Sequence, residues 1–329
     1  MTAVMKPKTL SSAIKSLAFS LLLKTPKAAF LYVPVLTFTA FFGGAYWILE
    51  LTTHFRFQYF VLSFFFLMVF ALIRMWRWAG VALLCLLINS TFVLPWYLPV
   101  KSVRADSGGQ KLRLLLTNVL WDNKTRPAVI NMARHEQPDL AFFQEVTYPW
   151  ATELEILRSD FPHYRLDPAE DAGGLASFSR IPFIRSELAP LAHLNGPAAI
   201  FQINIGGKLV SIVSVHAPPP AGKENFDNRT KTLKQAAEFV NTLPEPKIVI
   251  GDLNMTMWSP YYKRFIESTG LVNSREGFGV LPSWPTFLPP MSIPIDQCLI
   301  SRGIQVANIR TGSRVGSDHL PLIVDLVIP

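Results

Sequence analysis

The sequence predicts an α/β protein in two parts: an all-α transmembrane region of three helices and, after it, a four-layer α/β/β/α sandwich. Two observations lead to this prediction. Three long apolar runs without internal charge lie within the first 100 residues. Beyond them, strand-like runs alternate loosely with stretches of helical spacing, and the chain then becomes richer in strands. Mixed strands with helices on the outside suggest two sheets packed face to face and covered by helices.

The three apolar runs occupy residues 28–49, 57–73 and 78–99. Each is about long enough for one helix to cross a bilayer, which takes roughly 20 residues. The first run contains Pro34 and Gly43-Gly44, so it either spans as one helix or dips into the membrane and returns. We expect a membrane region at 28–100, after a basic N-terminal segment at 1–27. Residues 10–23 form either an amphipathic helix on the inner surface or a frayed end.

The charge pattern predicts the orientation. Residues 1–100 carry eight basic residues and one acid, Glu50, whereas the rest carries 23 basic and 22 acidic residues. Lysines before the first run and the basic turn 74–77 should stay in the cytoplasm. Three spans then make a multi-pass membrane protein with a cytoplasmic N-terminus and an extracytoplasmic domain, while a re-entrant first run would invert that answer. The near-neutral domain gives no general sign of nucleic-acid binding.

The domain follows a linker at 101–111 and covers residues 112–329. No intrachain disulfide is expected, because Cys85 lies in the third apolar run and Cys298 is the single cysteine of the domain. The domain must therefore be held by its core, for which about 220 residues are ample. The expected elements are strands at 112–119, 140–143, 174–179, 198–205, 208–215 and 248–250, helices at 126–137, 150–160 and 228–243, and further strands in the tail.

Polar side chains follow or precede several of these strands: Asn118, Glu145, His216, Asp252 with Asn254, Asp296, and Ser317-Asp318-His319. If neighbouring strands point the same way, these side chains meet at one acid-rich edge. Such a set supplies parts for metal-assisted attack on phosphate, since hard divalent cations prefer oxygen ligands. Taken singly, Asp-x-Asn is also a common turn, and a lone histidine at a strand end is more often structural.

Seven short motifs in order resemble the endonuclease/exonuclease/phosphatase superfamily: Thr117-Asn118-Val119, Gln144-Glu145-Val146, Gly173 to Arg180, Ser214-Val215-His216, Gly251-Asp252-Leu253-Asn254, Ile295-Asp296 and Ser317 to Pro321. The resemblance covers roughly residues 112–326. It implies a DNase I-like fold and a phosphoesterase that uses Mg²⁺, with Mn²⁺ or Ca²⁺ as alternatives.

The resemblance also implies roles for these residues. Glu145 would be the principal metal ligand, with Asn118 beside it and Asp318 completing the shell. Asp252 would orient or deprotonate the attacking water, and Asn254 would donate to a phosphate oxygen. His319, held by Asp296, would be an electrostatic clamp, and His216 would protonate or neutralise the leaving oxygen. Ser317 and Arg180 are expected to stabilise loops around the site, and His54, His135, His163 and His193 match no motif.

Departures from the family pattern reduce the number of substrate classes to be considered. The abasic-site endonuclease branch continues its first motif differently from Leu120-Trp121 and has an aromatic residue where His216 stands. That leaves nucleases, lipid phosphodiesterases and phosphatases. The proline-rich stretch 281–295 either packs its aromatic residues on the sandwich or exposes an apolar loop suited to a lipid. The leading interpretation is a membrane-anchored phosphodiesterase acting on nucleic acid or a phospholipid headgroup. A phosphomonoesterase and a catalytically silent membrane-tethered binding module are the alternatives, and no protein partner is indicated.

Overall fold

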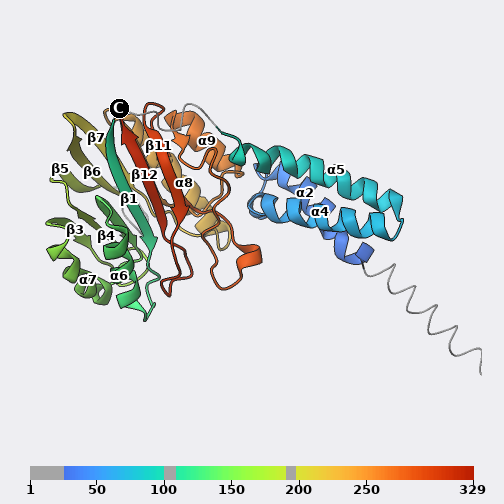
Figure 1. Ribbon diagram of the computed structural model, residues 1–329, viewed down its shortest axis with the longest axis horizontal. Helices are drawn as coiled ribbons and strands as arrows, with labels where there is room; N and C mark the ends of the chain where they lie inside the picture. The colour runs from blue at the N-terminus through green and yellow to red at the C-terminus, as the bar shows by residue number, and fades with distance from the viewer. Residues whose placement is uncertain (1–25, 100–108, 190–197) are drawn as a thin grey trace, which may run out of the picture.

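The computed structural model describes residues 26–99, 109–189 and 198–329. Two six-stranded sheets pack face to face with helices on both outer sides, and a bundle of apolar helices extends from one end (Figure 1). The four-layer α/β/β/α arrangement expected from the sequence is therefore confirmed for the C-terminal part. The expected helix at 10–23 and most of the linker lie outside the described residues.

The first sheet has the order β11-β12-β1-β2-β4-β3. Its outer face is covered by two helices and a 3-10 turn, because the apolar sides of these elements pack on β1, β2 and β4. The bounds of these elements are β1 Gln110–Asn118, β2 Leu140–Gln144, β3 His163–Asp167, β4 Leu175–Ser179, β11 Gln305–Thr311, β12 Leu322–Ile328, α6 Arg126–Glu136, α7 Tyr148–Leu154 and η3 Glu155–Ser159.

The second sheet has the order β5-β6-β7-β8-β10-β9, and helices α8 and α9 cover its outer face. Gly206 and Gly207, both with positive φ, make the tight β6–β7 hairpin expected from the sequence. The bounds are β5 Phe183–Ala189, β6 Ala198–Ile205, β7 Lys208–Ser214, β8 Lys247–Asp252, β9 Val272–Asn273, β10 Asp296–Ile300, α8 Lys223–Asn241, α9 Pro260–Thr269 and η4 Pro289–Met291.

The main core lies between the two sheets. Alternate residues of facing strands point inward, and Phe142 of β2 meets Phe201 of β6 with ring centroids 5.7 Å apart. Cys298 is fully buried in this core, as expected for a packing residue. The core fixes the two sheets against each other and thereby fixes the edge at which their polar residues meet.

The N-terminal apolar runs all form helices, but not three straight spans. The elements are α2 Tyr32–Thr39, η1 Ala40–Phe42, α3 Trp47–Thr53, α4 Arg56–Leu72, α5 Trp76–Val93 and η2 Leu94–Tyr97. Among the described residues, one helix, Trp76–Tyr97, is long and apolar enough to cross a membrane, and α4 is shorter. The first run breaks at the Gly43-Gly44 turn, where its two halves are bent by 118°, so it would count as a span only if both halves are taken together.

The helical region packs onto the sandwich rather than hanging from a free tether. Val93 is buried in the cluster beneath α8 and α9, and Trp258 Nε1 donates to Phe92 O at 2.9 Å. Trp96 O accepts from the backbone of Gly277 and Gly279. These contacts attach the end of α5 to the loops that follow β8 and β9.

Candidate active site

Parallel strand pairs deliver polar residues to one edge of the sandwich. Strand β1 runs parallel to β2, and Asn118 at its end pairs in register with Gln144, the residue before Glu145. In the other sheet β7 runs parallel to β8, so His216, two residues after β7, lies beside Asp252 at the end of β8. Asn118 Nδ2 lies 3.5 Å from Asp252 Oδ2, so the two sheets meet at this edge.

The remaining residues come from strands that begin at the same edge. Strand β10 is antiparallel to β8 and pairs Asp296 with Asp252. Strand β12 is antiparallel to β1 and starts shortly after His319. Convergence therefore does not need the common strand direction assumed from the sequence, because an antiparallel strand begins where its neighbour ends.

Glu145 and Asn118 form the first half of the site. Asn118 Nδ2 donates to Glu145 Oε1 at 2.8 Å, and the Trp121 amide donates to Glu145 Oε2 at 3.1 Å. Glu145 has a φ of +63°, a conformation that non-glycine residues adopt at a cost and keep where the surrounding fold enforces it. The unusual backbone aims the carboxylate at the shared edge.

Asp252, Asp296 and His319 form the second half. His319 Nδ1 donates to Asp296 Oδ2 at 2.9 Å, and its Nε2 lies 3.6 Å from Asp252 Oδ2. All three side chains are buried. Burial alone would lower the pKa of His319, but the charge and hydrogen bond of Asp296 and the charge of Asp252 outweigh it and raise that pKa to about 10. His319 is therefore a buried imidazolium between two carboxylates.

Burial affects the carboxylate of Asp252 in the opposite direction from the imidazole of His319. Burial raises its pKa, the positive charge of His319 offsets part of this, and the like charge of Asp296 adds to it, so the pKa is about 7. A carboxylate with such a pKa is suited to exchange a proton near neutral pH. Burial also lowers the pKa of His216, whose Nε2 lies 3.9 Å from Asp252 Oδ2, so His216 is neutral at pH 7.

Asn254 sits on the loop that leaves β8. Its backbone amide donates to Asp252 Oδ1 at 2.8 Å, and its side-chain amide donates to Ala217 O at 2.8 Å. Its φ of +48° again places a non-glycine residue in the left-handed region. Its side-chain amide also lies 3.3 Å from Asp252 Oδ2, so Asn254, which is half-buried, is held against Asp252.

Asp318 completes the set from the side of the proline-rich stretch. Trp284 Nε1 donates to Asp318 Oδ2 at 2.9 Å, and the Trp284 ring lies 6.4 Å from the His319 ring. Asp318 Oδ1 is buried and has no hydrogen-bond partner among the described residues. A buried carboxylate oxygen without a donor is stabilised by a nearby cation.

The donor set fits a hard divalent cation near Glu145. Glu145 offers carboxylate oxygens, and Asn118 offers its amide oxygen once the amide turns, since Oδ1 now accepts from the Leu120 amide. Asp318, which precedes His319 in the chain, has the unpartnered Oδ1 as a further oxygen ligand. Asp252, Asp296 and His319 also place one possible ligand atom each within 4.8 Å of one another. The His319 imidazolium has no lone pair to give, so that trio fits an electrostatic clamp better than a metal site.

Gln144 is a further residue of this site, and its motif alone predicted no role for it. Its Oε1 accepts from the Asp252 amide at 2.8 Å and its Nε2 donates to Val215 O at 2.9 Å. The side chain therefore ties β2 of one sheet to β7 and β8 of the other. Gly251 permits this approach, because a Cβ there would lie 1.8 Å from Val215 O and 2.8 Å from Gln144 Nε2. The sequence feature that could have indicated this role is a glutamine at the end of an otherwise apolar strand.

Ser317 acts as expected for a loop residue. Its hydroxyl donates to Asn118 O at 2.7 Å and accepts from the His319 amide at 3.0 Å, so it joins the end of β1 to the segment that carries His319. The same expectation is wrong for Arg180, which follows the opposite end of β4 because β4 is antiparallel to β2. Its guanidinium lies 5.2 Å from the Phe161 ring. His54 also has structural contacts, described below.

Comparisons with known proteins agree with this geometry. A model of the endonuclease/exonuclease/phosphatase family matches residues 115–319. No curated protein sequence matches the chain significantly. Among solved structures, a humanized D. rerio TDP2 is 15% identical over 66% of this chain and 98% of its own, with a TM-score of 0.55. An endonuclease/exonuclease/phosphatase from Beutenbergia cavernae is 18% identical over 67% of this chain and 72% of its own, with a TM-score of 0.54.

A third structure, sphingomyelinase C from Streptomyces griseocarneus, is 17% identical over 65% of this chain and 99% of its own, with a TM-score of 0.50. At such identities these likenesses show a shared fold. A two-sheet sandwich with an edge of acids, amides and histidines defines a class of phosphoester hydrolases. The chain belongs to the endonuclease/exonuclease/phosphatase family.

Proposed function

We propose that the chain is a membrane-anchored, divalent-metal-dependent phosphodiesterase. The observation that carries the proposal is the junction of the two half-sites, where Asn118 contacts Glu145, Asp252 and His319 with one amide group. A single edge therefore presents oxygen ligands for a cation, a carboxylate of raised pKa and a buried imidazolium. This complete set argues against the alternative of a catalytically silent module.

Each group has a step that its surroundings support. Glu145, Asn118 and Asp318 would hold a divalent cation, which would supply neutralisation of phosphate charge and polarisation of a phosphorus–oxygen bond. Asp252 takes the proton of the attacking water, which its raised pKa favours. The imidazolium of His319 and the amide of Asn254 stabilise the charge that develops on the phosphoryl oxygens. Neutral His216 hydrogen-bonds to the phosphate or to the leaving oxygen.

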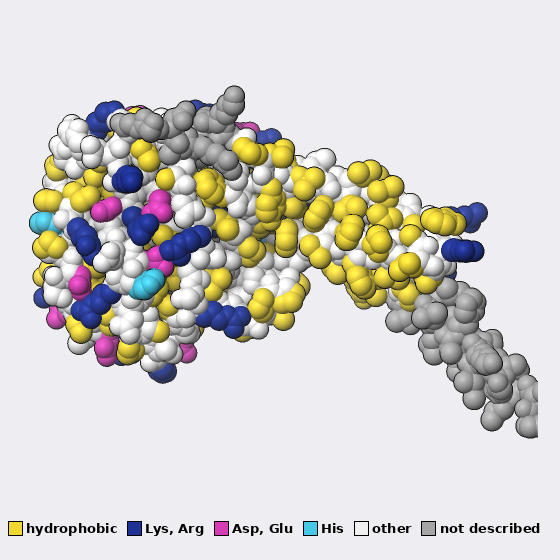
Figure 2. Space-filling view, in the orientation of Figure 1, with side chains coloured by type: hydrophobic (Ala, Val, Ile, Leu, Met, Phe, Trp, Pro, Cys, Tyr) yellow, Lys and Arg dark blue, Asp and Glu magenta, His cyan; other side chains and the backbone are white. Residues whose placement is uncertain are grey.

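A phospholipid headgroup is the substrate class that the surroundings favour over nucleic acid. In the stretch 281–295, Trp284 packs at the site, whereas Phe287, Leu288 and Met291 are exposed by 73%, 47% and 41%. Gln58 at the start of α4 donates to Pro290 O and Ser292 O. The exposed apolar loop therefore joins the active site to the base of the apolar helices, and Figure 2 shows hydrophobic side chains covering that region.

The test is hydrolysis by the full chain in detergent or nanodiscs. We expect activity on phospholipid and on an aryl phosphodiester with Mg²⁺ or Mn²⁺, and its loss in EDTA. Glu145→Gln should lower kcat by about 10²-fold or more, because the cation loses its main anionic ligand. Glu153→Gln is the matched control, since Glu153 pairs with Arg126 on the outer helices.

Other outcomes decide between the candidates. Preference for single- or double-stranded nucleic acid over lipid would select the nuclease, and preference for an aryl monoester would select the phosphomonoesterase. Wild-type turnover that persists after complete metal removal would contradict the metal-dependent mechanism. Absence of turnover on every substrate by a correctly folded protein would support the alternative of a catalytically silent binding module.

A further inference from the structure

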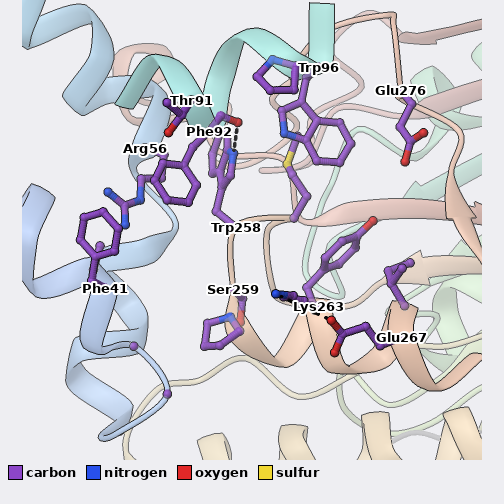
Figure 3. A pocket seen from close by; sticks show the side chains of 18 residues that line it. Phe41, Arg56, Thr91, Phe92, Trp96, Trp258, Ser259, Lys263, Glu267 and Glu276 are labelled. Atoms are coloured by element: carbon purple, nitrogen blue, oxygen red, sulfur yellow. Dashed lines mark hydrogen bonds and ion pairs between the residues drawn. The ribbon is translucent and has the colours of Figure 1, made fainter. Parts of the chain in front are cut away.

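A cavity of about 720 Å³ lies between the apolar helices and the sandwich, away from the active-site edge. Its walls are mostly apolar and aromatic, and the rings of Phe41, Phe92, Trp96 and Trp258 are among those that line it (Figure 3). Tyr262 of α9 also lines the cavity. The volume is in the range of pockets that hold an organic ligand of some size. Nothing in the proposed phosphodiesterase reaction uses this cavity.

Arg56 is the unusual residue of the cavity wall. It is the first residue of α4 and only 2% exposed. Its Nη1 donates to Thr37 O at 3.1 Å and to Asn89 Oδ1 at 3.3 Å, both neutral acceptors. The rings of Phe41 and Phe92 flank the guanidinium at 4.8 and 4.1 Å (Figure 3), and its Nε has no hydrogen-bond partner in the described part of the chain.

The neighbouring charges do not neutralise Arg56. Glu50, the nearest acid in the sequence, is held by His54 and by Arg229. Lys263 and Glu267 in the cavity wall pair with each other at 3.7 Å, and Glu276 lies on the opposite side of the cavity from Arg56 (Figure 3). A buried cation with neutral partners is costly, and an anion that reaches it is bound correspondingly well.

We propose that this cavity binds an anionic phospholipid of the bilayer, with the phosphate at Arg56 and apolar parts along the aromatic wall. The location selects this occupant. Arg56 stands at the end of α4 that faces the sandwich, two residues before Gln58, which contacts the apolar loop. That end is where headgroups lie if the helices are inserted in a membrane, and an anion with a long apolar portion is what the charge and the walls complement together.

The bound lipid would touch the loop that carries a catalytic residue. Met257, Trp258 and Ser259 of the cavity wall belong to the segment that begins at Asn254. Trp258 is fixed to α5 through its hydrogen bond to Phe92 O. The lipid is thus a stabilising ligand at the junction of helices and sandwich, distinct from any substrate, and binding can be measured without any enzymatic turnover.

The experiment measures lipid retention by the full chain. The delipidated protein is reconstituted with phosphatidylglycerol or phosphatidylcholine, and bound lipid is counted by native mass spectrometry. We expect the wild type to retain phosphatidylglycerol preferentially. Arg56→Gln should weaken that retention roughly 30-fold, because truncating one partner of a buried charge contact has an effect of this order. Arg74→Gln, the same charge change at an exposed site on the far end of α4, should behave as the wild type.

A second variant keeps the test valid if Arg56→Gln does not fold. Gly44 lines the cavity, and a Cβ there meets its neighbours only at 3.7 and 3.9 Å, so a side chain fits without strain. Gly44→Leu should fill part of the cavity and reduce retention while leaving Arg56 intact. Equal retention of the two lipids by the wild type, or wild-type retention in both Gly44→Leu and any folded Arg56→Gln protein, would overturn the proposal.

Discussion

At the scale of single residues, His319 and Asp296 behave as one group. The carboxylate accepts from His319 Nδ1 at 2.9 Å and is a main reason that the pKa of the imidazole stays high despite burial. His319→Ala should lower kcat by about 10²–10³-fold, as for loss of a charge-stabilising donor. Asp296→Ala should have a similar effect, and the double variant should be little worse than either. If the fold-loss of kcat in the double variant equals the product of the two single losses, His319 and Asp296 act independently and the pairing is contradicted.

Cys298 is expected to be chemically inert in the folded protein. Burial raises its pKa to about 12, slightly offset by the Ser274 hydroxyl, so almost no thiolate exists at pH 8. Iodoacetamide at pH 8 should leave Cys298 unmodified until denaturant is added, as read by peptide mass spectrometry. Rapid alkylation under native conditions would show that β10 opens far more readily than its buried pairing with β8 indicates.

The residues of the site were predictable because short polar motifs interrupt apolar strands. Asn118, Glu145, Asp252, Asp296 and His319 were all expected at one edge, and the structure places them there. Two features of the site could not be predicted from the sequence. The cross-sheet role of Gln144 depends on register between sheets, and the raised pKa of Asp252 depends on burial that only the folded chain creates.

At the scale of elements, the proline-rich stretch combines both interpretations that the sequence left open. Ile293 is buried and Trp284 contacts Asp318 and His319, while Phe287 projects with 73% of its surface exposed. Rigid proline-flanked backbone can hold such a side chain outward. Helices α6 and α7 and strands β1, β2, β4, β6, β7 and β8 were predicted to within a few residues, whereas the start of α8 was placed five residues too late. Helix α9 was missed, because the tail after β8 was expected to form strands. The bend at Gly43-Gly44 was foreseen only as an option, because hydropathy reports apolar length and not helix direction.

Phe287 allows the lipid hypothesis to be tested on one element. Phe287→Ser should lower turnover of phospholipid in vesicles by about tenfold, since an aromatic side chain gains on the order of 1.5 kcal/mol or more on burial. Turnover of a soluble aryl phosphodiester should be unchanged. Ile156→Ser is the matched control, because Ile156 is 53% exposed on η3, away from the loop. Equal losses on both substrates would assign Phe287 to the active site itself and not to the membrane.

At the scale of the whole molecule, a buried polar cluster connects the helical region with the catalytic loop. Arg229 of α8 forms an ion pair with Glu50 of α3 at 3.0 Å and donates to Asn254 O at 2.8 Å. Ser259 donates to Glu50 at 2.6 Å, and His54 lies 3.0 Å from Thr256. The sequence did not predict this cluster, because Glu50 stood out only as the single acid among the first 100 residues. Glu50 and Arg229 are in fact fully buried.

The orientation of this assembly in a membrane remains a prediction from charge. Lysines before residue 28 and the Arg74–Arg77 turn favour the cytoplasm for the end of the helices distal to the sandwich. That places the sandwich outside the cytoplasm. A reporter active on one side of the membrane, fused at the C-terminus, should give the extracytoplasmic signal, and a cytoplasmic signal would reverse both the topology and the accessible substrates.

The Glu50–Arg229 pair predicts that the sandwich is not independent of the helices. Glu50→Gln should lower the free energy of unfolding by about 3–5 kcal/mol, because Arg229 keeps its charge in a fully buried position without its anion. Glu238→Gln removes the same charge from an exposed pair with Lys234 and should change stability by less than about 1 kcal/mol. A fragment starting at residue 109 lacks Glu50 and should unfold as readily as Glu50→Gln. Arg229→Met in that fragment should restore part of the fragment's stability, since an apolar side chain at this position does not need the missing carboxylate. Denaturant unfolding followed by tryptophan fluorescence measures the full chain and the four altered proteins. A fragment as stable as the full chain would mean that the helices only tether the enzyme and take no part in holding its catalytic loop.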